Sequence, residues 1–115
     1  MSILSENVKK RLEELRTSFT ADLPERHRAI VAASELFFAH GEDEKNAWAL
    51  RNHAHKLAGA AATFGYGDLT RLGKSLEAIV DEVLDEARAP TDDENSEIRR
   101  LCAEIEAEIH GIHGD

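Results

Sequence analysis

The middle of the chain reads AHKLAGAAATFG at residues 54–65, and this stretch decides the fold. It continues a pattern of apolar residues that begins upstream and is spaced 3-4-3-4-3: Ala47, Leu50, Ala54, Leu57, Ala61 and Phe64. This spacing places all of them on one face of an α-helix. Glycines at 65 and 67 end the pattern. The stretch therefore predicts a long amphipathic helix over about residues 43–64.

Similar helical patterns lie on both sides of this segment. They predict four further helices at about residues 4–20, 23–40, 68–88 and 92–111. Asp22 and Pro24 have the character of a helix start, and Thr91 with Glu94 forms a potential capping box. The first segment has its own apolar stripe, formed by Leu4, Val8, Leu12, Leu15 and Phe19. Short turns between long helices favour antiparallel neighbours. We therefore expect a single all-α domain over residues 1–115, an antiparallel four-helix bundle with an additional N-terminal helix across one end.

The composition narrows the possible partners and locations. The formal net charge is −9, which argues against nucleic acid and anionic membranes as partners. No apolar run approaches the roughly 20 residues that cross a bilayer. The single cysteine, Cys102, cannot form an intrachain disulfide, and a cytoplasmic monomer is the expectation. Between Lys45 and Lys74 there are five basic residues and one acidic residue. This window either presents a basic face to an acidic partner or is simply a solvated surface.

His55 lies beside the apolar stripe, and small residues follow it on the same side of the helix. The residues that we expect to leave its approach clear are Ala58, Gly59, Ala62 and, one turn further, Tyr66. A glycine inside a helix costs about 1 kcal/mol relative to alanine, so Gly59 needs a reason. One explanation is access of a partner to His55. The other is close packing of two helices.

The run from His55 onward resembles the signature of histidine-containing phosphotransfer (HPt) domains. The matching positions are His55, Leu57, Gly59, Phe64 and Gly65, followed in the next helix by Leu69, Gly73, Leu76 and Glu77. The resemblance implies a helical bundle in which His55 accepts a phosphoryl group from a receiver-domain aspartate and passes it to another receiver. The implied partners are the receiver domains of a hybrid histidine kinase and of response regulators. The receiver would supply Mg²⁺, and the chain would need no cofactor of its own.

One position departs from the family pattern. Many members carry a lysine three residues after the histidine, near the phosphoryl group, whereas this chain has Ala58. The candidates for a replacement cation are Lys56, Arg51 and Lys74. The sequence contains no nucleotide-binding motif, so we expect a phosphocarrier without kinase activity rather than an enzyme. The alternative function is a helical scaffold that binds receivers or other signalling proteins without being phosphorylated.

The other histidines raise the question of a metal site, and two aromatic residues could have a role in packing or binding. His53 and His55 point about 200° apart on a helix and cannot share a metal ion. His110 and His113 have a compatible spacing but lie close to the chain end. We therefore expect no metal site. Trp48 and Tyr66 are expected to be packing residues, and Tyr66 could also join a partner interface.

Overall fold

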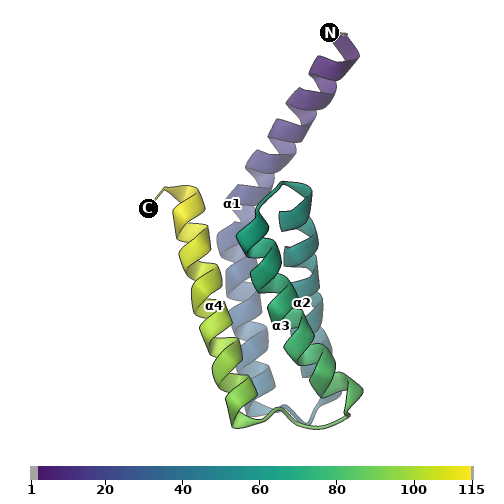
Figure 1. Ribbon diagram of the computed structural model, residues 1–115, viewed down its shortest axis with the longest axis vertical. Helices are drawn as coiled ribbons and strands as arrows, with labels where there is room; N and C mark the ends of the chain where they lie inside the picture. The colour runs from purple at the N-terminus through teal and green to yellow at the C-terminus, as the bar shows by residue number, and fades with distance from the viewer. Residues whose placement is uncertain (1–2, 115) are drawn as a thin grey trace.

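The structure is a computed structural model that describes residues 3–114, with side chains from residue 5 onward. It contains four helices: α1 (Ile3–Ala39), α2 (Glu44–Thr63), α3 (Gly67–Asp85) and α4 (Asp92–His113). Helix α1 packs against α2 and α4, and α3 packs against the same two helices (Figure 1). The described residues contain no strand. The predicted all-α four-helix bundle is confirmed.

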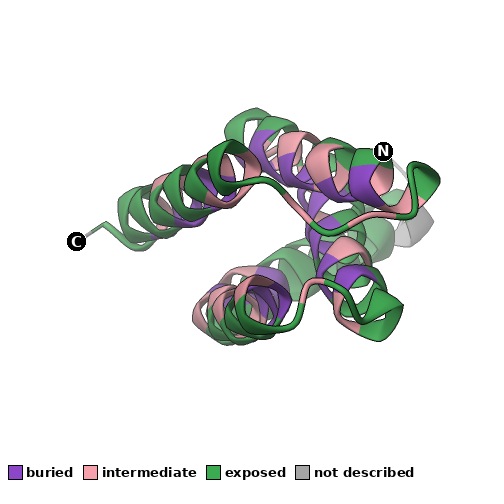
Figure 2. Ribbon diagram, turned by 90° about the horizontal axis from the view of Figure 1, so that it is seen from below, coloured by how far each residue is buried: buried purple, intermediate pink, exposed green. Residues whose placement is uncertain are grey.

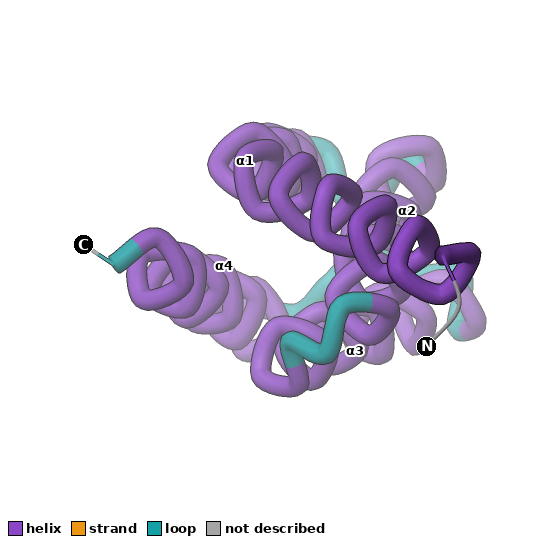
Figure 3. The backbone as a smooth tube through the Cα atoms, turned by 90° about the horizontal axis from the view of Figure 1, so that it is seen from above, coloured by secondary structure: helices purple, strands orange, loops and turns teal. Residues whose placement is uncertain are grey.

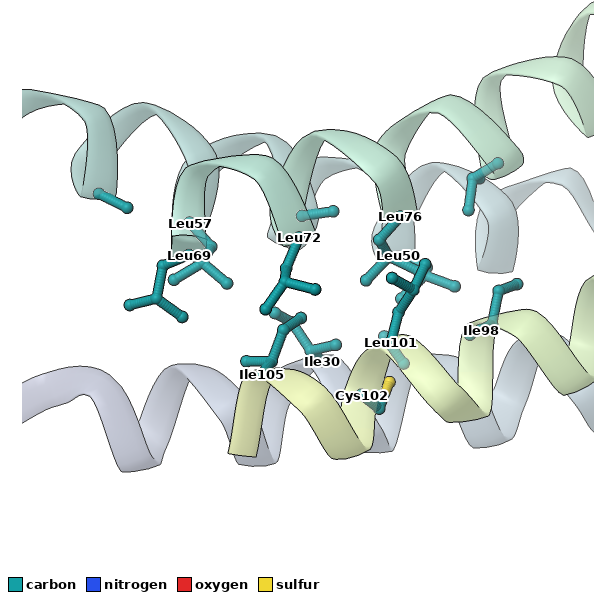
Figure 4. Close-up of a cluster of buried hydrophobic side chains, with 14 of the residues drawn as sticks. Ile30, Leu50, Leu57, Leu69, Leu72, Leu76, Ile98, Leu101, Cys102 and Ile105 are labelled. Atoms are coloured by element: carbon teal, nitrogen blue, oxygen red, sulfur yellow. The ribbon is translucent and has the colours of Figure 1, made fainter. Parts of the chain in front are cut away.

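The core lies along the axis of the bundle, between the inward faces of the four helices (Figure 2). Leucines of α2 and α3 meet isoleucines of α1 and α4 across this axis, as the close-up shows for Leu57, Leu72, Ile30 and Ile105 (Figure 4). Each of these four side chains is at most 1% exposed. Burial of a side chain of this size contributes about 1.5–3 kcal/mol. The 3-4 spacing in the sequence is thus the pattern that closes the bundle.

The predicted break between residues 20 and 23 is wrong, because α1 runs without interruption through Pro24. Instead of lying across one end, the predicted first helix is the N-terminal half of α1. A proline inside a helix removes one backbone hydrogen bond and costs about 3 kcal/mol or more. Phe19 and Leu23, just before the proline, are buried, as is Ile30 after it. Continuation of the helix keeps all three in one core.

The carbonyl group that Pro24 leaves without its helical partner is that of Thr20. His113, at the end of α4, donates from its Nε2 atom to this oxygen at 2.7 Å. This contact joins the end of α4 to α1 and satisfies a group that would otherwise lack a helical hydrogen bond. The tertiary structure therefore compensates for a local sequence signal that normally ends a helix.

The first half of α1 extends beyond the bundle (Figure 1), and in the view from above it lies nearest the viewer (Figure 3). Its apolar stripe begins to pack only at Phe19, whose ring lies 5.3 Å from that of Phe64. Val8, Leu12 and Leu15 are 40–52% exposed, and the side chain of Leu4 lies outside the described residues. Part of the stripe expected to pack across the bundle therefore faces solvent.

The predicted capping box at the start of α4 is confirmed. The Thr91 hydroxyl accepts from the backbone of Glu94, and the Glu94 side chain accepts from the backbone of Thr91. Glu94 also pairs with Arg88, and this guanidinium lowers the pKa of Glu94 to about 2. The start of α4 is thereby tied to the loop that connects it to α3. No helix in the described part of the chain is long and apolar enough to cross a membrane.

Candidate functional site

His55 stands on the outer face of α2, with 61% of its side chain exposed. Its Nδ1 atom lies 2.8 Å from Oε2 of Glu77, which comes from α3. A carboxylate can only accept a hydrogen bond, so Nδ1 carries the proton in this contact. In a neutral ring the lone pair is then on Nε2, the nitrogen on the opposite side of the ring. The geometry therefore holds His55 in a fixed orientation and, in the neutral ring, leaves the lone pair on Nε2.

Glu77 is shared between His55 and a cation. The Arg51 guanidinium lies 2.9 Å from the same Oε2 atom, and its Nε donates to Asp81 at 3.0 Å. The Glu77 side chain is only 15% exposed, so solvent screens these contacts less than it would at an open surface. The arrangement His55–Glu77–Arg51–Asp81 is a continuous polar chain between α2 and α3. Within it, Arg51 is already occupied by two carboxylates.

The two glycines near the site have different roles. A Cβ atom built on Gly59 would meet nothing within 4 Å, whereas one on Gly73 would lie 3.0 Å from Cβ of Ala58. Close helix packing, the second explanation for Gly59, therefore applies to Gly73 instead. Gly59 faces open space on the same side of α2 as His55, one turn further along the helix. Access to His55 is the explanation that remains for it.

The other residues expected to leave the approach to His55 clear differ in how exposed they are. Ala62 is exposed and Tyr66 is half-buried, with the Tyr66 ring 5.7 Å from that of Phe19. Ala58 is 4% exposed and lies against Gly73. The expectation that Ala58 belongs to the open face is therefore wrong. The position where the family pattern has lysine is here part of the contact between α2 and α3.

The three candidate cations lie in different surroundings. Lys56 is exposed and lines a groove between α1 and α2, together with Arg26 and His53. Lys74 is exposed on α3, one turn before Glu77. The contacts Glu77–His55 and Gly73–Ala58 show which faces of α3 and α2 meet, and Lys74 falls on the same side of α3 as Glu77 because the two are three residues apart. Among the described residues, Lys74 has no ion pair or hydrogen bond through its side chain.

The sequence does not reveal the polar contacts around His55. The motif includes Glu77 but does not indicate its contact with His55, and no pattern marks Asp81 as the partner of Arg51. Both carboxylates contact α2 only after α3 has folded against it. Cys102 is buried, and burial raises the pKa of its thiol, which disfavours a nucleophilic role. Within residues 3–114, no group of three His, Cys, Asp or Glu side chains is arranged to hold a metal ion. His55 is therefore a candidate nucleophile that is both exposed and held by a side-chain partner.

Comparison with protein families gives a match that covers most of the chain. The model of the family described as "Hpt domain" matches residues 14–113, which include all of α2, α3 and α4 and most of α1. Comparisons with curated proteins and with solved structures give no match.

Proposed function

The chain belongs to the Hpt domain family, whose members carry phosphoryl groups on histidine in two-component signalling, and we propose that His55 is the phospho-acceptor of this chain. The observation that carries the proposal is the contact of His55 Nδ1 with Glu77 on a ring that is otherwise open to solvent. A phosphoryl acceptor of this kind must have an accessible nitrogen with a free lone pair. The contact provides this at Nε2.

The proposed reaction is a reversible transfer between His55 and a receiver aspartate. Nε2 attacks the phosphorus atom of the aspartyl phosphate, a nitrogen–phosphorus bond forms, and the phosphorus–oxygen bond to the aspartate breaks. The electron pair of that bond leaves on the aspartate carboxylate. Phosphoryl transfer depends mainly on positioning and charge neutralisation. In this chain, Glu77 provides the positioning by holding the Nδ1 proton throughout the transfer.

The oxygen atoms beside His55 are few, and this bears on which protein would hold a divalent cation. Within residues 3–114, the one carboxylate in contact with His55 is Glu77, and its Oε2 atom is already shared by an imidazole and a guanidinium. Mg²⁺ prefers several oxygen ligands in an octahedral arrangement, which this surface does not offer. We therefore propose that Mg²⁺ enters with the partner receiver domain. Its role there is to neutralise charge on the phosphoryl oxygens.

Transfer from a panel of phosphorylated receiver domains tests the proposed function. The expected result is that labelled phosphate moves to the chain, and that the label is labile in acid and stable in alkali, as expected for phosphohistidine. Mass spectrometry of the phosphorylated chain should locate the label on the peptide that contains His55. Binding of receivers without any transfer would contradict the proposal and favour the scaffold function.

Lys74 is the cation that we propose to steady the phosphoryl group. It is exposed on α3 one turn from Glu77, whereas Arg51 is occupied and Lys56 lies on the side of α2 that faces α1. Lys74→Gln should lower the transfer rate about two- to fivefold, because an exposed charge contact contributes at most about 1 kcal/mol. The measurement is the transfer rate at low and high salt, with Lys56→Gln as the matched control. An equal loss in both variants would exclude a specific role for Lys74.

Glu77 is expected to act by orienting His55. In Glu77→Ala, His55 loses the group that fixes its ring and its tautomer, so the transfer rate at saturating receiver should fall about tenfold, the equivalent of about 1.4 kcal/mol. The affinity for the receiver should change little. The exposed Glu82 on the same helix provides a control, and Glu82→Ala should retain the wild-type rate. A normal rate in Glu77→Ala would show that the contact is dispensable.

A further inference from the structure

Trp48 is the single tryptophan of the chain, and it lies outside the core. It was expected to be a packing residue, yet it is 46% exposed on α2. Its ring is held in place from two sides: Nε1 donates to Glu44 at 3.1 Å, and the Arg51 guanidinium lies 5.9 Å from the ring centre. A large apolar surface is thus fixed in an exposed position. Such rings are frequent energetic anchors of protein interfaces.

Trp48 shares a face of α2 with His55. The two residues are seven positions apart, which is close to two full turns of the helix and about 10 Å along its axis. They are also linked through side chains, because Arg51 contacts both the Trp48 ring and Glu77, and Glu77 contacts His55. The exposed ring and the proposed phospho-acceptor therefore belong to one continuous surface between α2 and α3.

We propose that Trp48 is a docking anchor for the receiver domain that exchanges phosphate with His55. This inference rests on the proposed function. A standard protein interface covers about 800 Å² per partner, which is a patch of about 16 Å radius if it is flat. A receiver centred on His55 with such an interface covers Trp48, about 10 Å away on the same face. A receiver that docks in this way must carry an apolar patch at about this distance from its phosphorylated aspartate.

Receiver docking accounts for Trp48 better than self-association does. Two copies that met through Trp48 alone would bury far less than the roughly 1,200 Å² of a stable interface. They would also cover the face that His55 needs for transfer. In the receiver complex, by contrast, the ring lies inside an interface that His55 already requires. The receiver is therefore the occupant to which the proposal commits.

Steady-state transfer from a phosphorylated receiver is the primary test. Trp48→Ala should raise the KM for the receiver at least tenfold and leave kcat within twofold of wild type. Trp48→Phe keeps an aromatic ring and should recover most of the loss. Leu36→Ala provides the control, because Leu36 is 53% exposed but lies on α1, which contributes nothing to the polar chain at His55. Circular dichroism checks that all three variants fold.

Tryptophan fluorescence gives a second, independent readout. Titration of His55→Gln with a receiver that lacks tryptophan should shift the Trp48 emission to shorter wavelength. An unchanged KM in Trp48→Ala, a lower kcat at unchanged KM, or an emission shift that depends on chain concentration without receiver would each overturn the docking role. Failure of the proposed function would look different, since the wild-type chain itself would then accept no phosphate.

Discussion

His55→Gln is expected to abolish phosphorylation of the chain by any receiver. The glutamine side chain can still form hydrogen bonds with neighbouring groups, but its amide nitrogen has no lone pair available for attack on phosphorus. Because the His55 side chain is 61% exposed, its replacement should change the free energy of unfolding by less than about 0.5 kcal/mol. The measurement is transfer of labelled phosphate to the wild type and the variant, together with receiver affinity.

His53→Gln is the matched control for this experiment. His53 is an exposed histidine two positions away, but it lines the groove between α1 and α2 and does not contact Glu77. The His53→Gln variant should accept phosphate on His55 at the wild-type rate. Label on His55→Gln would disprove the site. Equal receiver affinity in both variants is expected, because binding and transfer are separate properties of the same surface.

Gly73→Leu is expected to cause the largest loss of stability among substitutions near the site. Even a Cβ atom at this position would lie 3.0 Å from Cβ of Ala58, 3.1 Å from its backbone nitrogen and 3.2 Å from the carbonyl oxygen of Ala54. Two of these atoms belong to the backbone of α2 and cannot rotate away. A leucine must therefore push α3 from α2, and we expect a loss of about 3 kcal/mol in the free energy of unfolding. Urea unfolding followed by circular dichroism measures it.

Gly59→Ala is the matched control, since Gly59 also lies inside a helix but faces open space. Here the added methyl group meets nothing, and the gain in helix propensity should stabilise the chain by about 0.5–1 kcal/mol. The two glycines should thus respond with opposite signs. A stable Gly73→Leu protein with an unchanged transfer rate would mean that α2 and α3 do not approach each other as closely as described.

Local patterns in the sequence were sufficient to predict α2, α3 and α4 and to single out His55 as a candidate. The 3-4 spacing predicted α2 nearly to its ends, and Thr91 with Glu94 marked the start of α4. These features depend on residues within one or two turns, where spacing alone determines which side chains share a face. The motif after His55 also identified Gly59 and Glu77 as noteworthy. It did not reveal that Glu77 contacts His55.

The break predicted near Pro24 shows how tertiary contacts can override a local signal. Proline weakens a helix through one lost hydrogen bond, but burial of Phe19, Leu23 and Ile30 on one face is worth more. His113, which comes from the far end of the chain, then satisfies the Thr20 carbonyl. No pattern within 20 residues of Pro24 contains this information.

The sequence by itself determined the apolar faces of α2, α3 and α4 and singled out the histidine that stands beside the first of these faces. The tertiary structure decided which residues from other helices meet that histidine. Gly59 and Gly73 illustrate the difference, because both are helical glycines in the sequence, yet one faces open space and the other touches Ala58. Their roles depend on the angle and register at which α3 packs on α2. That packing is set by the whole core rather than by neighbours along the chain.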